Sequence, residues 1–159
     1  AGISGGRTKE DILRIMSDSR IGALGAAAIA ALLLIKSFAL INVSAAHISA
    51  ALFVVPVMAR WNCTLLLLMC PYIRPNGLGK PLSEKISLAD AAFALASVLA
   101  LSFAVFGMKG IAVFAAVTGF GLVMCAYFRH RLGGITGDVC GSVIEASEAA
   151  ALLAVAALR

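Results

Sequence analysis

Charged residues are scarce in this sequence of 159 residues: Asp, Glu, Lys and Arg make up 13%, whereas hydrophobic residues make up 62%. Soluble domains usually contain about 25% charged residues. One small core cannot bury so much apolar surface, which excludes an ordinary soluble domain. The composition therefore predicts a polytopic membrane protein.

Motifs for metal or redox chemistry are missing as well. The four cysteines form no CxxC pair, neither histidine lies beside them at zinc-ligand spacing, and no Ser/His/Asp arrangement can be assembled. All four cysteines lie in or beside apolar stretches, so we expect reduced thiols packed in the interior and neither a disulfide nor a zinc site. The cysteines are Cys63, Cys70, Cys125 and Cys140.

Long apolar stretches are what the sequence has in abundance. Five of them are roughly 20 residues long, which suits helices that cross a bilayer. We predict an all-α fold, a polytopic membrane helical bundle with about five transmembrane helices plus an N-terminal amphipathic helix, forming one integral membrane domain over 1–159. The polar segment 1–20 comes first, and the predicted spans are about 21–41, 47–70, 88–108, 111–128 and 139–158.

Residues 1–20 predict a short amphipathic helix at the membrane surface or against the protein. Thr8 is followed by Glu10 and Asp11, which suits a helix start because acidic side chains are favourable near the positive end of the helix dipole. From Ile12 onward, apolar side chains recur at i, i+3 and i+4.

The basic residues predict an orientation. Two spans return the chain to its starting side, so segments 1–20, 71–87 and 129–138 share one face. That face holds nine of the thirteen basic residues, and the opposite face holds two, so the positive-inside rule places the first face in the cytoplasm. Because these residues act as topology signals, we expect no nucleic-acid partner. The nine are Arg7, Lys9, Arg14, Arg20, Arg74, Lys80, Lys85, Arg129 and Arg131.

Three glycine-rich turns fall on this predicted cytoplasmic face: "SGGR" (4–7), "PNGLG" (75–79) and "LGGITGD" (132–138). Glycine lets backbone N–H groups approach an anion closely, and a helix N-terminus adds partial positive charge. Each turn has a basic residue nearby, so the three together are compatible with a phosphate-binding site. The sequence leaves open whether they are only turns.

Acidic residues descend one side of the last predicted span. Asp138 caps a helix or binds a ligand, whereas Glu145 and Glu148 lie two to three turns inside the span. A charge at mid-bilayer costs at least about 2.5 kcal/mol, so such residues face a cavity or a partner. An ion pair, a protonated carboxyl and a divalent-metal site are all open. Together with the cationic turns, this acidic patch suits a phosphorylated substrate with a divalent metal.

Lys36 and Arg60 are the cations available within the spans. Lys36 either pairs with an acid or extends to the far interface. Arg60 follows Pro56, which interrupts the helical hydrogen bonding, and it either contacts an anionic group in a cavity or pairs with Glu145 or Glu148.

Four segments in this order resemble the cobalamin synthase family, the adenosylcobinamide-GDP ribazoletransferases. They are "SGGRTKEDILRIMSDSRIGALG" (4–25), "PVMARW" (56–61), "PYIRPNGLG" (71–79) and "GGITGDVCGSVIEASE" (133–148). In that family an Asp-rich stretch of the type "HLDGLxDTxDG" precedes the "GGR" turn, whereas this chain begins with "AGISGGR". The resemblance therefore implies a chain that corresponds to about the last two-thirds of the enzyme.

The resemblance implies an inner-membrane phosphotransferase of cobalamin (vitamin B12) biosynthesis with its active face in the cytoplasm. It would join α-ribazole or its 5'-phosphate to adenosylcobinamide-GDP and release GMP, with Mg²⁺ offsetting charge on the pyrophosphate. Homo-oligomerisation stays open. The alternatives are a small membrane transporter or channel subunit that uses Arg60, Glu145 and Glu148, or an inactive fragment of the synthase.

Matching positions give the predicted site. The predicted catalytic residues are Asp138 and Glu145, and the predicted metal ligands are Asp138, Glu145 and Glu148. The predicted substrate-binding residues are Gly6, Arg7, Asp18, Ser19, Arg20, Arg60, Arg74, Gly77, Thr136 and Gly137.

Overall fold

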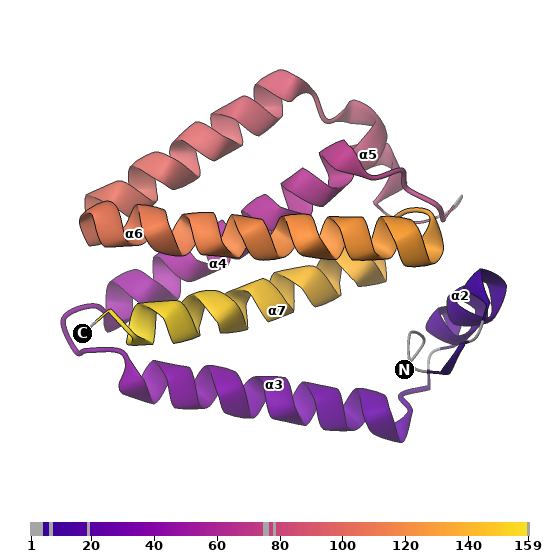
Figure 1. The fold of residues 1–159 in the computed structure, drawn as a ribbon, viewed down its shortest axis with the longest axis horizontal. Coiled ribbons are helices and arrows are strands. Elements are labelled where there is room, and N and C mark those ends of the chain that lie inside the picture. Colours follow the sequence, from indigo (N-terminus) through magenta and orange to yellow (C-terminus); the bar gives the residue numbers. More distant parts are fainter. Residues whose placement is uncertain (1–4, 7, 19, 75–76, 78, 159) are drawn as a thin grey trace.

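Each long apolar stretch of the sequence forms a helix in the computed structural model, which describes residues 5–6, 8–18, 20–74, 77 and 79–158. This part of the chain contains two short helices and four that are long and apolar enough to cross a membrane. The predicted all-α, polytopic membrane bundle is confirmed (Figure 1). The helices are α2 (Lys9–Ser17), α3 (Ala23–Asn42), α4 (Ile48–Met69), α5 (Lys80–Lys85), α6 (Leu88–Leu132) and α7 (Gly137–Ala156).

Helix α6 is a hairpin with two limbs, 88–106 and 108–132, which fold back on each other at Gly107 (Figure 1). Gly107 has φ 60° and ψ −144°, a conformation that side chains with a Cβ rarely adopt. The two limbs cover the predicted spans 88–108 and 111–128. The turn falls at Gly107 and not at Lys109 and Gly110, as the sequence suggested. A Cβ on Gly110 would overlap the backbone oxygen of Ser102, so this second glycine permits close approach of the limbs.

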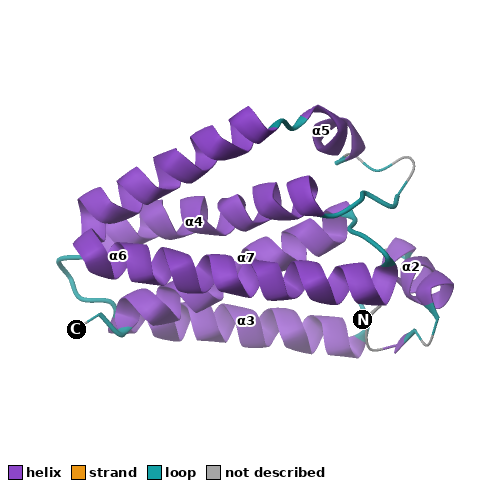
Figure 2. Cartoon of the chain, turned by 45° about the horizontal axis from the view of Figure 1, so that its top comes forward, coloured by secondary structure: helices purple, strands orange, loops and turns teal. Residues whose placement is uncertain are grey.

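Helix α4 lies at the centre of the bundle and packs against both α6 and α7. Its side chains at Val54, Val55 and Met58 are fully buried. Helix α3 lies at one edge and packs mainly against α7 (Figures 1 and 2). Most of its large apolar side chains are exposed, up to 82% for Ile41, as expected for a surface that faces lipid.

A buried polar residue joins the three central helices. The Asn62 side chain on α4 is fully buried, and its Nδ2 donates to the Val117 oxygen on α6 and to Ser147 Oγ on α7, both at 2.8 Å. Gly121 on α6 makes room, because a Cβ there would overlap the Asn62 amide. Hydrogen bonds of this kind hold helices together in an apolar environment, where burial of apolar surface gives no net drive.

The segments before α3, between α4 and α6, and between α6 and α7 meet at one end of the bundle, here called the α2 end. Ile12 of α2 is fully buried in a cluster with Leu66, Leu132 and Ile135. The predicted amphipathic helix therefore packs on the protein, with the Thr8 hydroxyl accepting from the Asp11 N–H as its N-cap. Its apolar stripe supplies the contact.

Backbone pairing fixes two turns of the α2 end side by side. Tyr72 and Ile135 form a parallel bridge, in which the Ile73 N–H donates to the Ile135 oxygen and the Ile135 N–H to the Pro71 oxygen, both at 2.9 Å. Gly134 allows this approach, because a Cβ there would overlap the Pro71 oxygen. The chain leaving α4 is thus attached to the chain entering α7.

The expectation of four reduced cysteines is wrong for one pair. Cys70 at the end of α4 and Cys125 on α6 are joined by a disulfide. Both lie in the buried cluster around Leu66 and Leu132, so the packing of α4 on α6 brings together residues that are 55 positions apart. Cys63 and Cys140 are free, as expected.

Replacing Asn62 by Ala removes both interhelical hydrogen bonds. We expect the free energy of unfolding in mixed micelles to fall by about 1–2 kcal/mol, measured by titration with a denaturing detergent. Ser97→Ala is the matched control, because the Ser97 hydroxyl bonds only to Phe93 in its own helix. Equal losses in the two variants would contradict a role for Asn62 in joining the helices.

Candidate functional site

Arg74 and Asp138 form the polar centre of the α2 end. Arg74 Nη1 donates to Asp138 Oδ2 at 3.1 Å, and Arg74 Nη2 donates to Ser17 Oγ at 3.0 Å. Arg74 follows the bridge at Tyr72, and Asp138 lies in the first turn of α7, so the pairing of the two turns places them together. The Asp138 side chain is 54% exposed and that of Arg74 is 33% exposed, which leaves both accessible to a ligand.

Asp18 and Arg20 form a second ion pair just before α3. The Arg20 guanidinium reaches both Asp18 oxygens, the closest at 2.8 Å, and the Arg20 backbone N–H donates to Asp18 Oδ1 at 3.0 Å. The hydrogen bonds from the Arg20 side chain, and then that from its backbone, hold the pKa of the Asp18 carboxyl below its usual value. Asp18 is therefore fully ionised at neutral pH.

A cavity of about 360 Å³ collects these groups. Asp18, Arg20 and Asp138 line it, together with Gly22 and Gly25 of the α3 start. The two glycines carry no side chain into the space, and the charged groups share its lining with apolar side chains such as Ile15, Met16 and Ile29. Arg74, paired with Asp138, stands beside it.

Thr136 and Gly137 build the start of α7. The Thr136 hydroxyl is fully buried and caps the helix by accepting from the Val139 N–H at 3.3 Å. The Gly137 N–H donates to the Tyr72 hydroxyl at 3.2 Å. Both residues, predicted to bind substrate, are thus engaged in placing Asp138.

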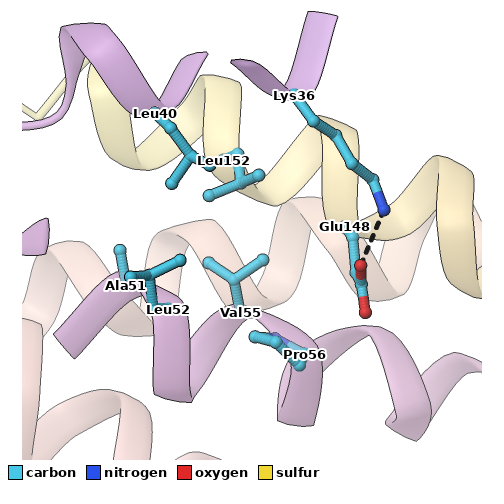
Figure 3. A pocket seen from close by; sticks show the side chains of 8 residues that line it. All are labelled: Lys36, Leu40, Ala51, Leu52, Val55, Pro56, Glu148 and Leu152. Carbon is cyan, nitrogen blue, oxygen red and sulfur yellow. Dashed lines mark hydrogen bonds and ion pairs between the residues drawn. The ribbon is translucent and has the colours of Figure 1, made fainter. Parts of the chain in front are cut away.

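A group of four charged side chains lies deeper in the bundle. Lys36 Nζ of α3 donates to Glu145 Oε2 at 2.6 Å and to Glu148 Oε2 at 2.7 Å. Arg60 Nη1 of α4 donates to Glu148 Oε1 at 3.3 Å and to the Pro56 oxygen at 2.9 Å. The sequence left open whether Lys36 and Arg60 form ion pairs. In the structure both of them do. Figure 3 shows Lys36 reaching from α3 to Glu148.

A row of three separate cavities lies along α3 and α7, from Asp138 to Glu148. A cavity of about 240 Å³ is lined by Ser142 and Glu145, and it shares Ala28 and Ile29 with the larger cavity at Asp138. A third, of about 160 Å³, is lined by Lys36, Glu148 and mainly apolar side chains (Figure 3). On α7 the residues that face this row recur at one-face helical spacing: Asp138, Ser142, Glu145, Glu148 and Leu152.

Two predicted glycines have packing roles. Gly6 is buried against Ile12 of α2, where a Cβ would overlap the helix backbone, and its oxygen accepts from Arg131 Nη2 at 3.4 Å. Gly77 lies against the ring of Tyr72, which also leaves no room for a Cβ. Arg7 and Ser19, also predicted to bind substrate, lie outside the described residues.

Sequence reasoning missed Ser17 and Tyr72. Ser17 ends α2 and binds Arg74, whereas Tyr72 binds the start of α7. Tyr72 stands inside the "PYIRPNGLG" segment, just before the glycine-rich turn 75–79, but no sequence pattern marks a hydroxyl that binds a backbone N–H.

The predicted metal ligands separate into two places. Among the described residues, no group of three or more His, Cys, Asp or Glu side chains could hold a metal ion. Glu145 and Glu148 do not fit Mg²⁺, because the Lys36 ammonium already binds both carboxylates. Asp138 is also bound by a cation, Arg74 at 3.1 Å, so it too would have to exchange this partner to hold Mg²⁺ together with substrate phosphates and water.

Comparison with known proteins places the chain in a family. The model of the cobalamin-5-phosphate synthase family matches residues 1–156. The chain is 35% identical to an adenosylcobinamide-GDP ribazoletransferase of Brevibacillus brevis, with 96% of the chain and 62% of that protein aligned. Proteins of the same name from Roseiflexus sp. and Ralstonia nicotianae are 34% and 40% identical, covering 95% and 88% of the chain.

The chain spans 62%, 56% and 55% of the length of these three relatives. No solved structure matches it significantly.

Replacing Arg20 by Gln removes the guanidinium that lowers the pKa of Asp18, so that pKa should rise toward its ordinary value of 3.8. Carboxyl ¹³C chemical shifts followed by NMR during a pH titration measure this. Because the folded-state pKa is lowered, the stabilisation by this pair is present above the ordinary pKa and is lost as pH falls through the lowered one. Arg14→Gln, which removes the partner of Asp11, is the control. An Asp18 pKa that is the same with and without Arg20 would refute the assignment.

Proposed function

The chain belongs to the cobalamin-5-phosphate synthase family, and we propose that it acts as a membrane phosphotransferase, an adenosylcobinamide-GDP ribazoletransferase. It joins α-ribazole, or its 5'-phosphate, to adenosylcobinamide-GDP and releases GMP, a late step of cobalamin biosynthesis. The observation that carries the proposal is the cavity at the α2 end, where two carboxylates and a guanidinium gather beside Arg74. A diphosphate needs such cationic partners at its binding site.

In the proposed reaction an oxygen of α-ribazole attacks the phosphorus attached to cobinamide, and the bond from that phosphorus to the GMP oxygen breaks. Transfers of this kind depend mainly on positioning and electrostatic stabilisation. Arg20 and Arg74 now pair with carboxylates, but their side chains are 88% and 33% exposed and so can turn to a diphosphate. We assign to Asp138 the role of accepting the proton of the attacking hydroxyl.

Mg²⁺ is part of this proposal at the Asp138 end of the row of cavities. When bound there it would offset negative charge on the diphosphate. Asp138, with Asp18 lining the same cavity, would hold it together with substrate oxygens. Glu145 lies on the same face of α7, deeper in the bundle, where it lines the adjoining cavity.

We further propose that the α2 end faces the cytoplasm from the inner membrane. The segments that meet at this end carry nine of the thirteen basic residues, against two at the other end. The positive-inside rule then sets the orientation. A transporter or channel that uses Arg60, Glu145 and Glu148 is not favoured, because Lys36 binds both carboxylates and Arg60 binds Glu148.

Proteoliposomes with adenosylcobinamide-GDP and α-ribazole test the function by GMP release. Asp138→Ala should lower the rate by about 100-fold or more, because it removes the proposed proton acceptor. Glu84→Gln, which removes an exposed carboxylate of α5, is the matched control and should keep the rate. Undiminished GMP release in Asp138→Ala would exclude the catalytic role. Solute flux without any GMP release would contradict the transferase itself.

A further inference from the structure

The ammonium of Lys36 lies where a metal ion would have to sit between the two intramembrane carboxylates. Its Nζ is 2.6 Å from Glu145 Oε2 and 2.7 Å from Glu148 Oε2. These are short, charge-assisted hydrogen bonds. The Lys36 and Glu148 side chains are only 15% and 17% exposed, so little water competes for them.

Arg60 completes the charge balance of the group. It binds the second oxygen of Glu148 at 3.3 Å, so each oxygen of that carboxylate has a cationic partner. Two ammonium or guanidinium groups and two carboxylates leave no net formal charge. A divalent ion would therefore meet no excess negative charge, and binding between the two carboxylates would require the loss of the lysine contacts.

Lys36 also links α3 to α7. Among the described residues of α3, only Ala39 is buried. Near its start, the helix lines the cavity at Asp138 with glycine and alanine among its residues. The lysine is the charged contact between the two helices in this otherwise apolar and small-residue interface. It therefore fixes the positions of Glu145 and Glu148 relative to α3.

We propose that Lys36 is a positioning residue that occupies the cation place between Glu145 and Glu148 and keeps divalent metal ions away from them. The divalent ion of the proposed reaction then binds at the Asp138 end of the row, not at the intramembrane glutamates. Only this second statement rests on the proposed function. The first follows from the side-chain geometry alone and holds whatever reaction the protein catalyses.

Binding of Mn²⁺, a paramagnetic substitute for Mg²⁺, tests the proposal without any assay of activity. The full chain in lipid nanodiscs is titrated with Mn²⁺, and free Mn²⁺ is measured by EPR. With Lys36 present, the Glu145→Gln/Glu148→Gln variant should bind as many Mn²⁺ ions per chain as the wild type. Lys36→Met should gain one ion, because the freed carboxylates become ligands.

Three variants separate this outcome from general disruption of the fold. Lys36→Arg should bind like the wild type, because guanidinium also fills the place. Lys36→Met combined with both Glu→Gln changes should lose the added ion. Lys109→Met, which removes a lysine at the turn of α6, should bind like the wild type.

Loss of a Mn²⁺ ion from Glu145→Gln/Glu148→Gln, with Lys36 in place, would overturn the proposal. So would an unchanged count in folded Lys36→Met. If Lys36→Met does not fold, the comparison of Glu145→Gln/Glu148→Gln with the wild type still decides. Absence of GMP release in the wild type would reject the proposed function but leave these Mn²⁺ counts valid. Loss of one Mn²⁺ ion in Asp138→Asn would show that the metal of the proposed reaction binds at Asp138.

Discussion

A charge inside a membrane span has to be paired, and in this fold that constraint connects α3 to the rest of the bundle. Lys36 meets Glu145 and Glu148, and Arg60 meets Glu148 from α4. The two glutamates are therefore the point at which three helices are held in register. The position of α3 in turn sets one wall of the cavity that contains Asp18, Arg20 and Asp138.

Much of the fold could be predicted because length and hydropathy determine membrane helices directly. The four long apolar helices, the amphipathic α2 and its Thr8 cap follow from local pattern, whereas the short helix α5 was not predicted. The turn of α6 was placed two to three residues late, at Lys109 and Gly110, because a polar Lys109 looked like a break whereas the backbone turns at Gly107, which has a positive φ. The Cys70–Cys125 disulfide depends on packing between distant segments, which spacing cannot reveal.

The candidate site was predictable as a set of residues but not as an arrangement. Sequence placed the acids on one face of the last helix, and the structure has them in a row of cavities facing α3. It left open whether Lys36 would pair with an acid, and it did not indicate that Arg74 would join Asp138, because such pairing depends on three-dimensional contact. Tyr72 was missed since its role is to bind a backbone N–H, which has no sequence signature.

The exposed apolar face of α3 has a consequence for the biogenesis of the protein. Lipid tails solvate leucine and isoleucine as well as a neighbouring helix does, so insertion of α3 and its docking onto α7 are separable steps. Before docking, Lys36 can extend toward an interface and remain hydrated. Docking then removes that hydration in exchange for two carboxylates that are synthesised more than a hundred residues later. Helix α3 therefore stays inserted but undocked until the last helix leaves the ribosome.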